Sequence, residues 1–291
     1  MNRRSFIKGA AVSVLSLALG ATGALLPGCS SGQDDQSANS ESDGQAVELQ
    51  IFAANSLEKA MTEVQELYTS INPNITFKDS QFKGSGDLVE MLVGGASADI
   101  LITASTGTMD SAEAYIVPET RVTMFGNDLH VCAAEDSNIK INDLTDLRKD
   151  KIKRIGIGDP ALVPAGKYAN QSLYNASSGD DKLYSSAEGE GGNYGGGIEK
   201  KIVVADKVGT CATWAASGNV DVSFVYNSDL TRYEGVKSIY AVPEDLHKVI
   251  IYPGAVINDS QHQDEANEFL RFCMTDPDAL KIWQENGFEL K

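Results

Sequence analysis

The chain of 291 residues is poor in the side chains that most often hold metals, with four cysteines and three histidines. The cysteines after Cys29 are widely spaced, at Cys132, Cys211 and Cys273, and none forms a Cys-x-x-Cys pair. Such spacing argues against a zinc or iron–sulfur site. The odd number leaves one disulfide open without naming it, and buried free thiols are the state we expect.

Basic residues are also few. Lysine and arginine number 24 against 41 aspartates and glutamates, which gives a net charge of −17. Nucleic acid is therefore not an expected partner, because phosphate backbones are bound by basic patches. An acidic protein can still hold an anion if local dipoles and hydrogen-bond donors act against its overall field.

A long hydrophobic run is missing as well, and residues 1–28 have the pattern of an export signal. Arg3-Arg4 is followed by Phe6 and Lys8, and then by a moderately apolar stretch from Ala10 to Leu26. This order is typical of a twin-arginine signal. Glycines and a proline interrupt the apolar stretch, which is short for a membrane span.

The signal ends in Leu26-Pro27-Gly28-Cys29, which resembles a bacterial lipobox. We expect Cys29 to be lipidated and the polar residues 29–46 to form a disordered tether. The protein would then be anchored to the outer face of the cytoplasmic membrane. The proline before the glycine is unusual and leaves cleavage by an ordinary signal peptidase as the alternative.

Strands and helices alternate through residues 47–291, which are enough for two lobes. Apolar runs predict strands, and apolar residues three and four apart predict helices, such as the one from Leu57 to Ile71. This order, with short connections, predicts open α/β sheets. The expected strands are Val47–Ala54, Ile75–Phe82, Asp99–Ala104, Leu129–Ala134, Arg154–Gly158, Lys201–Ala205, Val222–Tyr226, Ile239–Val242 and Val249–Val256.

The segment between Tyr174 and Gly197 is rich in glycine and serine. Its glycines do not fit the dinucleotide pattern G-x-G-x-x-G, because Tyr194 stands at the third glycine position and no strand leads into them. We therefore expect a mobile surface loop, and we expect no cofactor.

Hydrogen-bond donors follow the strands at the points where open α/β sheets bind ligands. Ser56 is predicted to be an N-cap whose hydroxyl accepts from a backbone N–H one turn into the helix. A helix start that faces a cleft can also hold an anion. Carboxylates and histidines are rare at these junctions, which argues against general acid–base catalysis. The junctions are Asn55-Ser56, Gly84-Ser85, Pro164-Ala165-Gly166, Val208-Gly209 and Tyr226-Asn227-Ser228.

Several motifs together resemble the molybdate-binding proteins of ABC importers, which are two-lobed periplasmic binding proteins of type II. The motifs are AANSLEKAM, FKGSGDL, GASADILITAS, GDPALVPAGKYA, VSFVYNSD, PEDLHK and the final NGF. The resemblance implies two lobes, each an open, mixed and mainly parallel sheet flanked by helices, with the ligand in the cleft between them. Residues 47–127 and 250–291 would form lobe 1, and residues 128–249 would form lobe 2.

The resemblance also implies an oxyanion site. Ser56 and Ser85 would donate their hydroxyls, Ala165 and Val208 their backbone N–H groups, and Tyr226 its phenol. This chain departs from the family pattern in three places and adds the long glycine-rich loop. The departures are Asn55, the pair Lys83-Gly84 before Ser85, and Gly209-Thr210-Cys211 after Val208.

The chemistry of molybdate fits such a set of donors. Molybdate near neutral pH is a fully deprotonated tetrahedral dianion, so each of its oxygens can only accept hydrogen bonds. Neutral donors at helix starts cost less to desolvate than a buried lysine or arginine. The expected function is capture of molybdate, and of tungstate as well, by a monomer that delivers it to an ABC importer permease.

Three other functions stay open from the sequence alone. The nearest is a binding protein of the same kind for another oxyanion, such as sulfate. The second is an exported serine hydrolase that uses Ser56 or Ser85, although neither lies in a G-x-S-x-G motif and neither has an obvious base. The third is an adhesion module on a tether, which would bind no small ligand.

Overall fold

A computed structural model describes residues 46–290, apart from the side chain at position 180. The predicted signal, Cys29 and nearly all of the predicted tether lie outside these residues. The described residues belong to one compact unit with its own core. Within residues 46–290, no helix has both the length and the apolar composition that a bilayer span requires.

The larger sheet has six strands in the order β13-β6-β12-β5-β2-β4. β2 pairs in parallel with β4 and β5, whereas β12 runs antiparallel to β5 and β6. A separate parallel pair joins β1 to β3. The bounds are β1 Val47–Leu49, β2 Ile51–Ala54, β3 Ile75–Phe77, β4 Gln81–Lys83, β5 Ile100–Ile102, β6 Val122–Gly126, β12 Ile251–Val256 and β13 Glu289–Leu290.

The second sheet has five strands in the order β11-β7-β10-β8-β9. β8 is parallel to β9 and β10, and β7 is antiparallel to β10 and β11. Both sheets are mixed, as predicted. They are not mainly parallel, because β6, β7 and β12 run antiparallel to their neighbours and antiparallel pairs are no rarer than parallel ones. The bounds are β7 Leu129–Ala134, β8 Ile155–Gly158, β9 Ile202–Ala205, β10 Val222–Tyr226 and β11 Val236–Ala241.

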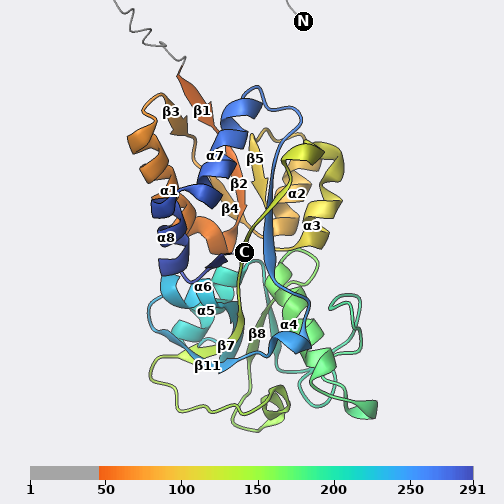
Figure 1. Cartoon of the computed structure of the whole chain (residues 1–291). Helices are drawn as coiled ribbons and strands as arrows, with labels where there is room; N and C mark the ends of the chain where they lie inside the picture. The colour runs from red at the N-terminus through yellow and green to blue at the C-terminus, as the bar shows by residue number, and fades with distance from the viewer. Residues whose placement is uncertain (1–45, 291) are drawn as a thin grey trace, which may run out of the picture. The chain divides into compact units, whose positions relative to one another are not determined.

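Helices cover both faces of the six-stranded sheet, with α1, α7 and α8 on one side and α2 and α3 on the other (Figure 1). In the other half, α4 and α5 pack on β8 and β10. Early and late parts of the chain therefore build one half and the middle builds the other. The bounds are α1 Glu58–Ile71, α2 Ser85–Val93, α3 Thr106–Ser111, α4 Pro164–Asn175, α5 Val208–Ala216, α6 Asn227–Arg232, α7 Gln263–Thr275 and α8 Pro277–Glu285.

Strand β2 shows why its residues are all apolar. Successive side chains in a strand point to opposite faces. Ile51 and Ala53 belong to the core cluster that holds α1 and α7, whereas Phe52 belongs to the cluster that holds α2 and α3. A strand covered on both faces needs apolar residues at every position, so the continuous run in the sequence was the right signal.

Three sequence predictions about elements need correction, and one strand was missed. Val47–Ala54 is not one strand, because the chain breaks at Gln50, whose N–H donates to Asp99 Oδ2 at 2.6 Å. Ile75–Phe82 is likewise two strands, β3 and β4, and strand β6 was missed. Ser56 is not an N-cap: it lies inside a 3₁₀ turn, Asn55–Leu57, and its hydroxyl bonds to Tyr252 instead of to the helix.

The glycine-rich segment is packed more closely than a plain surface loop. Leu183 and Tyr184 are buried, and Tyr184 pairs with Tyr194 through an isolated β-bridge. Gly189 has φ of 79°, and a Cβ there would lie 2.2 Å from the Lys167 carbonyl oxygen. Glycine is therefore required at this contact, which sets the segment against α4.

The three cysteines within the described residues are free and buried, as expected. Cys132 lies in β7 and Cys211 in α5, both in the half built on the five-stranded sheet, and Cys273 lies in α7. Burial raises the pKa of each of these thiols. Each thiol therefore stays protonated and behaves as a small apolar side chain.

Candidate functional site

The five residues predicted for the oxyanion site meet around one small cavity between the two sheets. Ser56 follows β2, Ser85 is the first residue of α2, and Tyr226 is the last residue of β10. Ala165 is the second residue of α4, and Val208 is the first residue of α5. The remaining lining residues are Ala54, Asn55, Lys83, Gly84, Ala104, Val163 and Pro164.

The cavity is small, and no negatively charged residue of the described chain lines it. Its volume is about 10 Å³, close to the least space that holds one water molecule. Among the described residues that line it, Lys83 is the charged one, and neither a carboxylate nor a histidine is present. A nucleophilic serine would have no base here, which removes the support for a hydrolase.

Tyr226 holds a polar group that nothing in the described structure satisfies. The side chain is 1% exposed, and its hydroxyl has no hydrogen-bond partner among the described residues. Burial raises the pKa of Tyr226, and the nearby Tyr252 adds to the rise. The phenol therefore stays protonated and can donate. A buried hydroxyl without a partner is costly, so its place in a cavity beside two serines and three helix starts points to a ligand that accepts.

The two serines are each hydrogen-bonded to a neighbour beside the cavity. Ser85 Oγ accepts from the N–H of Ala104 at 3.0 Å, which leaves its own O–H free to point elsewhere. Ser56 Oγ lies 2.9 Å from Tyr252 Oη, and either hydroxyl can donate in this bond. Both serines are almost fully buried beside the cavity.

Three helix starts add backbone donors. Helices α2, α4 and α5 begin at the cavity wall, and the first N–H groups of a helix have no partner within it. The partial positive charge at a helix start favours an anion by the same geometry. Ala165 and Val208 lie in the first turn of α4 and of α5.

Asn55 has a role that the sequence did not reveal. Its Oδ1 accepts from the N–H of Gly209 at 3.1 Å, so it uses a donor of helix α5 and joins the two halves beside the cavity. A Cβ at position 209 would lie 2.7 Å from this oxygen and 2.1 Å from Tyr233 Oη. The departures Asn55 and Gly209 therefore fit each other, although 154 residues separate them.

A second contact across the halves lies next to Asn55. Arg232, at the end of α6, donates to the carbonyl oxygen of Asn55 at 2.6 Å and forms an ion pair with Glu58 at the start of α1. The arginine side chain is mostly buried and the glutamate is partly exposed. These bonds hold the start of α1 against α6 beside the cavity.

Asp229 is a buried acid beneath the cavity. One oxygen accepts from the N–H of Tyr226 at 3.0 Å, and burial raises the pKa of this carboxyl to about 7. The folded protein thus binds its proton more tightly than the unfolded chain, whose pKa is near 3.8. Stability from this group is complete below pH 4, falls as the pH rises toward 7, and is level above.

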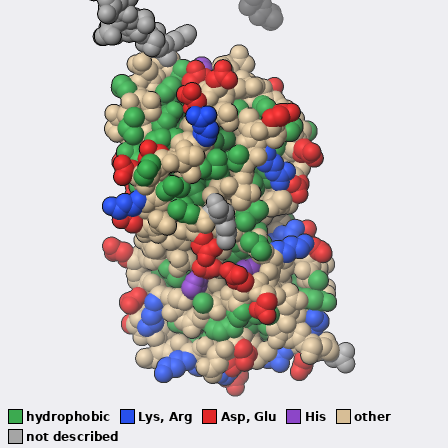
Figure 2. Space-filling view, in the orientation of Figure 1, with side chains coloured by type: hydrophobic (Ala, Val, Ile, Leu, Met, Phe, Trp, Pro, Cys, Tyr) green, Lys and Arg blue, Asp and Glu red, His purple; other side chains and the backbone are tan. Residues whose placement is uncertain are grey.

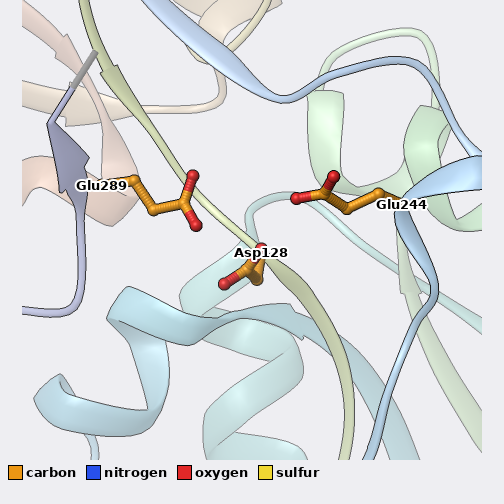
Figure 3. A group of neighbouring side chains, drawn as sticks. All are labelled: Asp128, Glu244 and Glu289. Atoms are coloured by element: carbon orange, nitrogen blue, oxygen red, sulfur yellow. The ribbon is translucent and has the colours of Figure 1, made fainter.

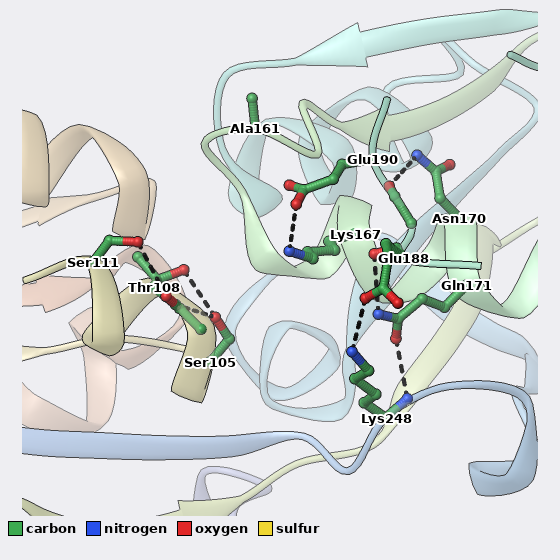
Figure 4. Close-up of polar contacts among 12 residues, drawn as sticks. Ser105, Thr108, Ser111, Ala161, Lys167, Asn170, Gln171, Glu188, Glu190 and Lys248 are labelled. Carbon is green, nitrogen blue, oxygen red and sulfur yellow. Dashed lines mark hydrogen bonds and ion pairs between the residues drawn. The ribbon is translucent and has the colours of Figure 1, made fainter. Parts of the chain in front are cut away.

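The mouth of the cleft is lined by polar side chains from both halves (Figure 4). Ser105, Thr108 and Ser111 face it from around α3, and Lys167 faces it from α4. The glycine-rich segment is attached here through two ion pairs, Glu190 with Lys167 and Glu188 with Lys248, both at 2.9 Å. This wider groove, unlike the inner cavity, contains carboxylates.

A group of acids lies outside the cavity. Asp128 follows β6, Glu244 lies in a 3₁₀ turn and Glu289 in β13, and their carboxylate oxygens approach within 4.8 Å of one another (Figure 3). Acidic side chains also gather near the middle of the face in Figure 2. Carboxylates could bind a hard cation, but exposed acids commonly gather without one, and this group does not contact the cavity.

Comparison with known proteins agrees with the geometry. A family model described as bacterial extracellular solute-binding protein matches residues 49–289. YvgL of Bacillus subtilis, named as a candidate ABC transporter substrate-binding lipoprotein, is 28% identical over 91% of this chain and 93% of its own. The molybdate-binding protein ModA of Haemophilus influenzae is 28% identical over 84% of this chain and 91% of its own.

Solved structures give the same result for the fold. The substrate-binding domain of a candidate molybdenum ABC transporter from Clostridium difficile has 31% identity and a TM-score of 0.61, covering 84% of this chain and 99% of that one. The periplasmic molybdate-binding protein of Azotobacter vinelandii has 18% identity and a TM-score of 0.68, with 84% and 99% covered. The sulfate-binding protein SubI of Mycobacterium tuberculosis has 17% identity and a TM-score of 0.67, with 83% and 86% covered.

Proposed function

Because the chain belongs to the bacterial extracellular solute-binding protein family, we propose that it captures molybdate in the cavity around Tyr226. It is a binding protein of an ABC transporter rather than an enzyme, and it has the two-lobed type II fold. Molybdate as the ligand is supported by relatives of that name, by the resemblance of the site residues and by the chemistry of the cavity.

One observation carries the proposal. The Tyr226 hydroxyl is buried in a cavity that contains donors and no carboxylate, and it has no partner among the described residues. A tetrahedral dianion that only accepts would satisfy this hydroxyl, the two serine hydroxyls and the N–H groups of Ala165 and Val208 together. Hydrogen bonds to a charged acceptor are the strong ones, and the burial of Ser56, Ser85 and Tyr226 keeps water from weakening them.

The proposal extends to a second ligand, to the two lobes and to transport. We propose that tungstate binds as well, since it has the same charge and shape. Residues 47–127 with 250–291 and residues 128–249 would be the two lobes that close on the ion. The protein would act as a monomer, exported by the twin-arginine route and anchored through Cys29, and would pass the ion to a membrane permease.

Calorimetric titration of residues 44–291 tests the ligand, because this part of the chain is a compact unit with its own core. Molybdate, tungstate, sulfate and phosphate are each titrated into the protein. The proposal expects tight binding of the first two and little heat from the others. Tight binding of sulfate alone would assign another oxyanion to the same site, and no heat from any anion would overturn the proposal.

A further inference from the structure

The hydroxyl of Ser56 can be either donor or acceptor toward Tyr252, and the choice decides what it offers to the cavity. The two oxygens are 2.9 Å apart and buried, with Ser56 3% exposed and Tyr252 fully covered. If Tyr252 donates, the serine hydrogen is free to point at a ligand. If Ser56 donates, its oxygen presents only lone pairs to the cavity.

Asn127 fixes the direction of this bond. Its Oδ1 accepts from the N–H of Asp128 at 3.0 Å and from the N–H of Ser228 at 3.4 Å. A backbone N–H can only donate, so the amide oxygen must lie on that side and the NH₂ group on the other. The NH₂ group then donates to Ser228 Oγ at 2.8 Å and to Tyr252 Oη at 3.2 Å.

Tyr252 therefore accepts from Asn127 and gives its own hydrogen to Ser56. Burial raises the pKa of Tyr252, so the phenol keeps the proton that this arrangement needs. Its ring is held between Tyr226 and Phe288, with centroids 6.0 Å and 5.5 Å away. Reversing the bond would leave the Tyr252 hydrogen buried without an acceptor, because Asn127 presents only hydrogens to it.

We propose that Asn127 and Tyr252 are positioning residues that hold Ser56 as a donor and so select a fully deprotonated tetrahedral anion over a protonated one. The inference rests on the proposed function and concerns selectivity within that site. Phosphate keeps at least one proton near neutral pH and needs an acceptor for it. Ser56 could accept that proton through its second lone pair only by turning its own hydrogen away from the ion, and no acceptor for that hydrogen is described on the other side, because Tyr252 already donates there. Ser85, whose oxygen accepts from Ala104, likewise keeps its hydrogen for the ion.

Tyr252→Phe tests the inference in residues 44–291. The ring keeps its packing, and Ser56 is freed to rotate. The measurement is the affinity for molybdate by calorimetry, together with competition by phosphate. We expect molybdate to bind a few-fold more weakly and the preference for molybdate over phosphate to fall by about tenfold. A merely structural role would change both affinities alike and leave their ratio unchanged.

Tyr184→Phe is the matched control, since it removes another buried tyrosine hydroxyl, one that accepts from Gly192 away from the cavity. Asn127→Ala is the second variant. It frees Tyr252 to turn and should lower the preference for molybdate over phosphate in the same way. It therefore tests the inference even if Tyr252→Phe folds poorly. If phosphate competes no better in Tyr252→Phe and Asn127→Ala than in the wild type, the positioning role of Asn127 and Tyr252 is overturned and the proposed function stands. If the wild type binds no tetrahedral anion, the proposed function is overturned and the positioning role with it.

Discussion

Replacing Tyr226 by phenylalanine should move ligand affinity and protein stability in opposite directions. The hydroxyl is buried without a partner among the described residues, so the closed, unliganded protein gains nothing from it. Leaving a buried hydroxyl unpaired costs about 1–3 kcal/mol. Removing it should leave the melting temperature unchanged or raise it, by roughly 2–4 °C for each kcal/mol in a chain of this size.

The bound state should respond the other way. A hydrogen bond to a charged group contributes about 1.5–3 kcal/mol, so losing it should weaken molybdate binding roughly 10- to 150-fold. Calorimetry gives the affinity, and thermal melting with and without molybdate gives the stability. In the control Tyr184→Phe, which loses a satisfied hydroxyl, the melting temperature should fall and the affinity should stay the same.

Two outcomes would refute this reasoning. Unchanged affinity in Tyr226→Phe would mean that the hydroxyl does not face the ion. A melting temperature several degrees lower without ligand would mean that the hydroxyl is satisfied in the empty protein, so that it is no evidence for a ligand at all.

Three further changes give distinct results. Ser85→Asp should nearly abolish molybdate binding in calorimetry, because like charges repel, while the helix start tolerates the acid and the melting temperature holds. Asp229→Asn should remove a loss of stability of roughly 4 kcal/mol between pH 4 and 7, measured by denaturant titration, since the carboxyl pKa is raised to about 7. Glu58→Gln should speed molybdate release about two- to fivefold in stopped flow, because the pair with Arg232 holds the closed form.

Each of these has an outcome that contradicts it. Normal binding in Ser85→Asp would place the ion elsewhere. A pH profile that is the same with and without Asp229 would mean that this acid does not titrate in that range. Release that is as slow in Glu58→Gln as in the wild type would mean that the ion pair contributes nothing to closure.

Local patterns predicted the strand–helix order, and the five residues that the resemblance implied lie around one cavity. Continuous apolar runs mark strands buried on both faces, and β2 is such a strand. The strand ends carry the donors, because consecutive strand–helix units bring their junctions to one edge. These features depend on residues that are close together in the sequence, so they can be predicted from the sequence alone.

Features that depend on distant partners could not be predicted. Ser56 looked like an N-cap because a helix follows it, but its hydroxyl is hydrogen-bonded to Tyr252, which lies 196 residues away. Asn55 and Gly209 both depart from the family pattern, and only the structure shows that they are hydrogen-bonded to each other. The glycine-rich segment looked like a mobile loop from its composition, although the Tyr184–Tyr194 pair lies within it and two ion pairs attach it to the rest of the protein.

The three buried thiols have a consequence for kinetics. A protonated, covered cysteine reacts with a thiol reagent only when its surroundings open, so the rate of labelling measures how often they do. Cys132 and Cys211 would report on the half built on the five-stranded sheet and Cys273 on the other. Comparing their labelling rates, with and without molybdate, would show which half fluctuates more and how far a bound ion suppresses each motion, without any engineered probe.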